Sequence, residues 1–207
     1  VLDTLQHLGS MGYREFEILV TQPHFWATDF TANERRDIPI KLADQGLHVT
    51  SVNIPGIDNN IVSGTREMRE FTIKVLSDLV DICGDWKIPY CIFVPGRTIP
   101  LFPIPKEQLM EWFIEGMITL ANRASDQGVT MLIENVPNTW IPRAENVMEA
   151  LAGTLKTAKR HKVVDYESEL LMQGMSDNIV IYLLKEQIED STINKCKFIN
   201  AYILGLK

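Results

Sequence analysis

Short apolar runs alternate with longer amphipathic stretches through about the first 155 residues, and this alternation is the feature that most restricts the fold. The unit recurs roughly every 30 to 40 residues, which indicates parallel strands joined by right-handed helical crossovers. The predicted strands cover residues 16–20, 48–54, 90–94 and 129–133, and the predicted helices cover residues 2–8, 32–45, 65–83 and 106–126.

Glycine and proline mark the predicted boundaries. Gly9, Gly46 and Gly84 are expected to end the first three helices, and Pro39 is expected to kink or divide the second helix. The Pro-rich stretch 99–105 contains two large apolar residues, so it is predicted to be an ordered loop rather than a linker.

Polar or turn residues lie at the ends of several predicted strands. Glu17 lies within the first strand, Asn53 lies near the end of the second, residues 95–97 follow the third, and Glu134 and Asn135 follow the fourth. Neither a GxGxxG sequence nor a Walker motif is present to favour an open doubly wound sheet. Polar groups from several strand ends that converge on one opening are typical of a (β/α)8 barrel, and we therefore predict a barrel.

Glu134 is the most informative of these residues because it ends a run of apolar residues, 129–133. Parallel strands are covered on both faces, and their carboxyl ends open onto loops that carry function. Glu134 is therefore expected at the rim of an active site. The alternative, left open by the strand pattern alone, is a solvated or arginine-paired residue at an ordinary strand end.

The composition indicates a soluble globular protein with one domain. The 207 residues are 45% hydrophobic, and no apolar run approaches the length of a membrane span. A net charge of −7 argues against a nucleic-acid partner, although a local basic patch can override the global balance.

The three cysteines, Cys83, Cys91 and Cys196, are too few and too scattered for a disulfide framework or a zinc cluster. Their odd number fits a reducing compartment, and the chain opens with a helix-like segment rather than a secretory signal, so a cytoplasmic location is expected. Cys91 lies within an apolar run and is predicted to be a small core residue.

Three segments carry a resemblance to a known family: Gly12-Tyr-Arg-Glu-Phe-Glu-Ile18, Val94-Pro-Gly-Arg97 and Leu132-Ile-Glu-Asn-Val-Pro137. In this order and spacing they resemble the xylose isomerase-like TIM-barrel superfamily of sugar phosphate isomerases and epimerases. The resemblance covers residues 1–155 and implies a single TIM-barrel-like domain over 1–207, in which residues 156–207 are atypical.

The resemblance also implies a divalent metal site, formed in this family by a Glu, an Asp, a His and a second Glu from successive strands. It implies that Glu134 is the first metal ligand and one of two carboxylates that act as acid and base. Asp165, which ends the strand-like run 161–165, is the candidate second ligand, although it could instead be a surface acid in a charged turn. Oxygen-rich ligands suit Mg²⁺ or Mn²⁺, and Co²⁺ or Zn²⁺ is tolerated when an imidazole joins them.

The later ligands of that set do not match this sequence. The last histidine is His161, and the strand-like run 179–184 leads into Lys185 and Glu186 rather than into a histidine. A complete barrel needs about 250 residues, so the expected fold is an incomplete barrel with no first strand and a divergent or truncated last quarter. Its open edge favours aggregation, pairing with another chain, including a homo-oligomer, or a tail that rebuilds the wall differently.

Five residues near the predicted strand ends are candidates for substrate contact. Arg97 could bind a sugar hydroxyl or a phosphate, or form a plain surface salt bridge. His24 could line a sugar site, although a packed loop is favoured there. Trp140 could shield the substrate or cap the hydrophobic rim, Glu17 could face the opening or pair with an arginine, and Asn135 adjoins Glu134.

Three functional hypotheses follow. The first is a metal-dependent isomerase or epimerase of carbohydrate metabolism, which acts on a small sugar or sugar phosphate by proton transfer next to a carbonyl. The second is a non-catalytic or degenerate barrel relative that has lost the metal site. The third, an abasic-site endonuclease, is disfavoured because that branch needs many histidines, and this acidic chain has four.

Overall fold

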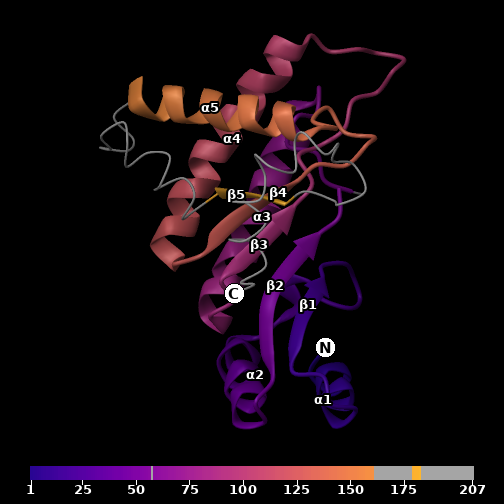
Figure 1. Cartoon of the computed structure of the whole chain (residues 1–207), viewed down its shortest axis with the longest axis vertical. Helices are drawn as coiled ribbons and strands as arrows, with labels where there is room; N and C mark the ends of the chain where they lie inside the picture. Colours follow the sequence, from indigo (N-terminus) through magenta and orange to yellow (C-terminus); the bar gives the residue numbers. More distant parts are fainter. Residues whose placement is uncertain (57, 161–178, 183–207) are drawn as a thin grey trace.

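The computed structural model describes residues 1–56, 58–160 and 179–182. Within these residues every predicted strand and helix is present, and the order of strands and helices confirms the alternation (Figure 1). The elements are α1 (Leu2–Ser10), β1 (Glu15–Leu19), a 3-10 turn η1 (Ala27–Asp29), α2 (Ala32–Asp44), β2 (His48–Ile54), α3 (Arg66–Trp86), β3 (Tyr90–Phe93), α4 (Lys106–Gln127), β4 (Thr130–Glu134), α5 (Ala144–Arg160) and β5 (Ile179–Tyr182).

The five strands form one parallel sheet in the order β1-β2-β3-β4-β5. Sequential parallel strands joined by helices are the arrangement of a TIM barrel, and the described part is an open segment of one. The strand-like run predicted at 179–184 is confirmed over 179–182, where β5 pairs with β4. The strand-like run 161–165 lies outside the described residues.

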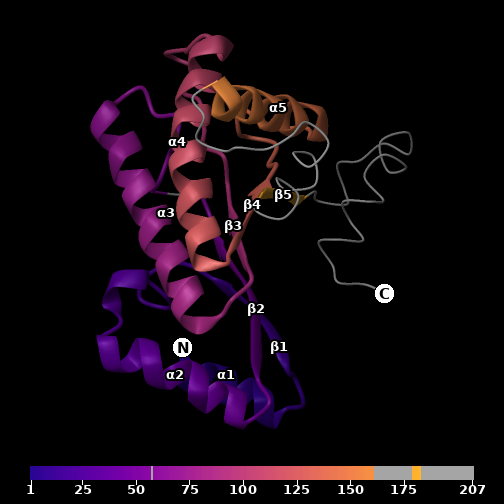
Figure 2. The ribbon, with the colours of Figure 1, turned by 90° about the vertical axis from the view of Figure 1, so that its left-hand side faces the viewer.

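The main core lies between the sheet and the helices. Figure 2 shows α3 and α4 side by side along one side of the strands. Apolar residues of these helices pack there against residues of the strands that point toward them, including Phe93, Met131 and Ile133. Cys91 is fully buried in this core, which confirms its prediction as a small core residue.

The strand register separates this core from the other face of the sheet. In a parallel sheet, residues in register point to the same side. Leu19, Asn53, Ile92 and Leu132 are in register across four strands and alternate with the residues that face the helices. Ile92 and Leu132 are buried but do not belong to the helix-side core, so the second face, here called the inner face, has its own layer of residues.

The second helix is continuous, although Pro39 was expected to kink or divide it. α2 runs through Pro39 from Ala32 to Asp44, and a capping box between Thr31 and Glu34 fixes its start. The helix buries Ile38 and Leu42 on either side of the proline. This burial offsets the lost backbone hydrogen bond that otherwise breaks a helix. The predicted division at Pro39 is therefore wrong, and the alternative, a kink at Pro39, stays a prediction.

The third helix ends later than predicted. α3 passes through Gly84 to Trp86, and Lys87 takes the left-handed conformation that ends it. A Cβ at residue 84 would lie 3.1 Å from the Cβ of Gln127 at the end of α4, which is a tight contact. Gly84 is therefore a site of close approach between two helices rather than a helix stop, and Trp86 continues the helix because its ring packs against Phe25 and Phe30.

None of the helices in the described ranges is long and apolar enough to cross a membrane.

Candidate active site

Glu134 lies at the carboxyl end of β4, as the sequence predicted. It is half-buried, and its Oε2 accepts a hydrogen bond of 3.2 Å from Nδ2 of Asn53. Asn53 belongs to β2, two strands away, and shares the inner face with Leu132. The inner face therefore brings a carboxylate and a carboxamide together from residues 81 positions apart in the sequence.

The surroundings of Glu134 raise the pKa of its carboxyl group above the ordinary value of 4.5. Burial is the largest cause, because it disfavours the charged form, and the negative charge of Glu17 acts in the same direction. The hydrogen bond from Asn53 opposes both effects. The carboxylate is thus a stronger proton acceptor than an exposed glutamate.

This raised pKa gives a pH-dependent stability. Below the unfolded-state pKa, Glu134 is protonated in both states; as the pH rises through the higher folded-state pKa, the folded state loses stability relative to the unfolded state. The Glu134→Gln variant lacks this loss. We therefore expect the free energy of unfolding of the variant minus that of the natural protein to increase from pH 4 to pH 7. Urea denaturation with EDTA present measures it, and the exposed Glu145→Gln serves as the control. A difference that is constant with pH would contradict the assigned burial effect.

Glu17 lies on the inner face of β1, in register with Ser51 of β2. The hydroxyl of Ser51 donates a hydrogen bond of 2.6 Å to Oε2 of Glu17. No arginine pairs with Glu17 in the described part of the chain, and its predicted position at the opening stays a prediction. Its contact with substrate stays a prediction.

Asn135 and Trp140 organise the loops beyond the strand ends. Asn135 is buried, and its Nδ2 donates a 3.4 Å hydrogen bond to the carbonyl of Pro142. The indole Nε1 of Trp140 donates a 2.8 Å hydrogen bond to the carbonyl of Pro95, in the loop after β3. The ring also packs edge-on against Phe113 of α4, with 5.4 Å between centroids. Trp140 therefore caps the hydrophobic rim, which is one of its two predicted roles.

Arg97 follows β3 and is exposed, but its backbone is fixed. The side chain of Asn60 accepts a hydrogen bond of 3.2 Å from the Arg97 N–H and donates one of 2.9 Å to the Arg97 carbonyl. Gly96 beside it has φ of 98°, and a Cβ there would collide with Asn60. The surface salt bridge considered for Arg97 is not found among the described residues.

His24 lies in the loop after β1 and is exposed, whereas the neighbouring Phe25 is buried against Phe30 and Trp86. This is the packed loop that the sequence favoured. The backbone N–H of His24 donates a hydrogen bond to the carbonyl of Thr21 in its own loop, and no hydrogen bond or ion pair within the described residues joins His24 to Glu134.

Of the two predicted metal ligands, only Glu134 lies in the described part of the chain. Asp165 lies outside the described residues, and within the described ranges no group of three His, Cys, Asp or Glu side chains is close enough to hold a metal ion. Glu134 is therefore the one predicted ligand that the structure places, and the metal site stays a prediction.

Sequence reasoning missed Ser51 and Asn60. Ser51 could have been found, because it precedes Asn53 by two positions, and residues two positions apart in a strand lie on the same face. Asn60 lies in an irregular loop, and its contact with Arg97 spans 37 residues, so the sequence pattern held no signal for it.

A family model described as "Xylose isomerase-like TIM barrel" matches residues 5–163. A D-psicose 3-epimerase from Clostridium cellulolyticum H10, solved with D-tagatose, superposes with a TM-score of 0.69 and 14% identity, covering 96% of this chain and 64% of that one. A xylose isomerase-like TIM barrel protein from Mycobacterium smegmatis, solved with magnesium, superposes with a TM-score of 0.57 and 15% identity, covering 74% of this chain and 52% of that one. At these identities, the likeness concerns the fold.

A second similarity involves a shorter segment. A Costars family protein from Nematostella vectensis is 58% identical over 45 residues, which is 22% of this chain and 55% of that protein. The chain thus spans about half the length of the curated relatives it matches, and less than two thirds of the epimerase chain.

Proposed function

The chain belongs to the xylose isomerase-like TIM barrel family, and we propose that it acts as a divalent-metal-dependent isomerase or epimerase of a sugar or sugar phosphate. The observation that carries the proposal is Glu134, a half-buried carboxylate with a raised pKa at the carboxyl end of a parallel strand. This is the edge at which barrel enzymes place their catalytic groups.

In the proposed reaction Glu134 takes or returns the proton on the carbon next to the substrate carbonyl. Its raised pKa brings the carboxylate closer to the operating pH, which suits a general base. Asn53 holds one carboxylate oxygen and so fixes the orientation of the side chain. Ile92 and Leu132 form an apolar layer on the same face, which limits the access of water.

The donor chemistry of Glu134 fits a hard divalent cation. Its carboxylate is partly removed from water and has Asn53 as an outer hydrogen-bond partner, an arrangement common around metal ligands. We propose Glu134 and Asp165 as ligands of Mn²⁺ or Mg²⁺, with Co²⁺ or Zn²⁺ as alternatives. A bound cation would stabilise negative charge that develops on the carbonyl oxygen. The magnesium in the mycobacterial neighbour supports this choice of cation.

The epimerase neighbour, which was solved with the ketose D-tagatose, supports ketoses as the substrate class. A second candidate function, a non-catalytic barrel relative, is favoured by the sequence, because the run 179–184 leads into Lys185 and Glu186 rather than into the histidine that the family's ligand set requires. Metal content separates the two functions.

Metal binding tests the proposal directly. With Mn²⁺ in excess, we expect the purified chain to retain a near-stoichiometric amount of metal, and Glu134→Gln to retain much less, because a carboxamide is a weaker ligand. Elemental analysis after desalting measures this, and the exposed Glu145→Gln is the matched control. Occupancy below a few per cent in the natural chain would favour the non-catalytic alternative.

A further inference from the structure

Most arginine side chains in the described part of the chain are held by another group of the protein. Three bind a carboxylate on another turn or element, one binds its neighbour in sequence, one binds backbone carbonyls, and one lies over a tryptophan ring. These are Arg35 with Asp85, Arg66 with Glu70, Arg123 with Asp81, Arg36 with Asp37, Arg14 with the carbonyls of Gly9 and Tyr13, and Arg69 over Trp112.

Arg97 and Arg143 are different. Among the arginines whose side chains the structure describes, these two have no hydrogen bond, ion pair or ring contact through the guanidinium group, and both are exposed. Both also lie at the same end of the sheet as Glu134, in the loops that follow β3 and β4. These two uncommitted guanidinium groups therefore lie at the rim of the proposed active site.

The two loops are fixed to each other and to the site. Trp140, three residues before Arg143, donates its hydrogen bond to Pro95, two residues before Arg97. Asn135, which adjoins Glu134, holds the carbonyl of Pro142 beside Arg143. Together with the two hydrogen bonds between the Asn60 side chain and the Arg97 backbone, these contacts hold both arginine backbones in place and leave the guanidinium groups available.

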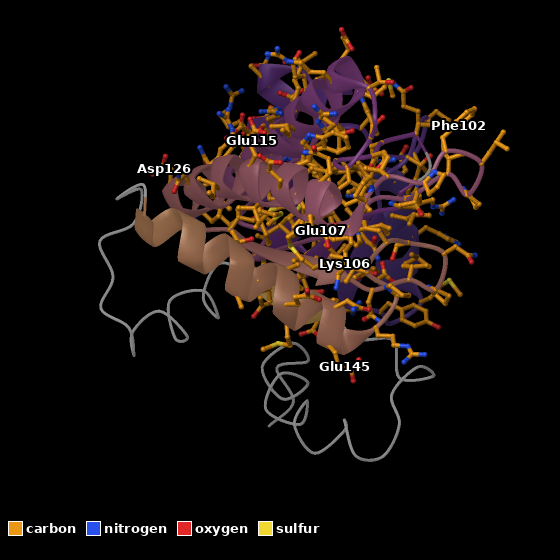
Figure 3. The ribbon with its side chains drawn as sticks, turned by 90° about the horizontal axis from the view of Figure 1, so that it is seen from above. Phe102, Lys106, Glu107, Glu115, Asp126 and Glu145 are labelled. Carbon is orange, nitrogen blue, oxygen red and sulfur yellow. The ribbon has the colours of Figure 1, made fainter. Side chains whose placement is uncertain are left out.

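The distribution of charge indicates what such arginines bind. The chain has a net charge of −7, so an anionic ligand is repelled unless a local positive group attracts it. Inside the rim, the negative charges of the Glu17 and Glu134 carboxylates repel an anion from the strand ends. Glu145 lies close to Arg143 in sequence, at the start of α5 (Figure 3), but no ion pair joins the two. A guanidinium binds phosphate or carboxylate through two parallel hydrogen bonds.

We propose that the substrate carries an anionic group, a phosphate or a carboxylate, at a distance from its reacting carbon, and that Arg97 and Arg143 bind this group. This inference rests on the proposed function, because it assigns the substrate class of the same site. The uncharged part of the sugar then lies toward Glu134, and the anion stays on the outer loops.

Ligand binding by the full chain in EDTA tests the inference without any metal. Isothermal titration compares D-ribulose, D-ribulose 5-phosphate and D-fructuronate at constant ionic strength. We expect at least one of the two anionic ligands to bind about tenfold or more tightly than D-ribulose. The better ligand identifies the anion as phosphate or carboxylate.

Substitutions then locate the binding site. Arg97→Gln and Arg143→Gln are each expected to weaken the preferred anion about tenfold and to leave D-ribulose binding unchanged, because each removes a charge-assisted contact. Arg97→Lys keeps the charge but not the two-pronged geometry, and is expected to restore part of the affinity. The control is Arg36→Gln, because Arg36 is an exposed arginine on α2. This substitution should leave the affinity for all three ligands unchanged.

Two results would overturn the inference. One is equal affinity for D-ribulose and both anionic ligands, and the other is a loss of anion affinity in Arg36→Gln as large as that in Arg97→Gln and Arg143→Gln. Proton exchange on D-ribulose without an anion preference would reject the anion site while the proposed function stands. Arginine-dependent anion binding by a chain that takes up no Mn²⁺ would support the anion site and reject the proposed function.

Discussion

Glu134→Gln is expected to lower the rate of proton exchange next to a ketose carbonyl by about 10²- to 10⁴-fold, the usual contribution of a positioned general base. The carboxamide has nearly the same shape and can still accept the hydrogen bond from Asn53. It cannot take up a proton and is a poor metal ligand. The substitution therefore removes the chemistry while it preserves the packing of the inner face.

Uptake of solvent deuterium into D-tagatose, followed by NMR with Mn²⁺ present, measures this exchange. Glu145→Gln removes an exposed carboxylate from α5 and should exchange at the rate of the natural chain. Asn53→Ala should retain an intermediate rate, because it leaves Glu134 in place without its hydrogen-bond partner. Exchange by Glu134→Gln at the natural rate would refute the assigned role of Glu134.

The elements of this fold could be predicted from the sequence because each of them depends on local pattern. Apolar runs bounded by turn residues gave four strands, and the position of Glu134 at a strand end followed from one of them. The errors occurred where packing between distant residues overrides a local rule. Gly84 was expected to stop α3, but it is small because α4 passes close to it, and Trp86 extends the helix into an aromatic cluster.

The candidate site was less predictable for the same reason. The hydrogen bond between Asn53 and Glu134 depends on the curvature and register of a sheet, not on any spacing along the chain. The pKa of Glu134 depends on burial, which only the assembled inner face determines. Likewise, Arg97 could be chosen as a candidate from its place after a strand, but its lack of an ion pair could be recognised only when the partners of the other arginines were known.

Phe113→Ala is expected to lower the free energy of unfolding by about 3–5 kcal/mol, the range for truncation of a fully buried phenylalanine. Phe113 is 0% exposed and lies on α4 between the helix-side core and Trp140. A loss of this size is a large part of the total stability of a typical domain. Phe102, also a phenylalanine but 71% exposed and at the periphery of the molecule (Figure 3), provides the matched control. Its replacement by alanine should change the free energy of unfolding by no more than about 0.5 kcal/mol.

The same substitution tests whether the core supports the rim. Trp140 packs on Phe113 and, through its hydrogen bond to Pro95, joins the loops that carry Arg97 and Arg143. A cavity beneath the indole should therefore weaken anion binding as well as stability, whereas Phe102→Ala should affect neither. Urea denaturation and titration with D-ribulose 5-phosphate measure the two effects. A cost below about 1 kcal/mol for Phe113→Ala would contradict the observed packing. A large cost with unchanged anion affinity would show that Trp140 holds the two loops without support from the core.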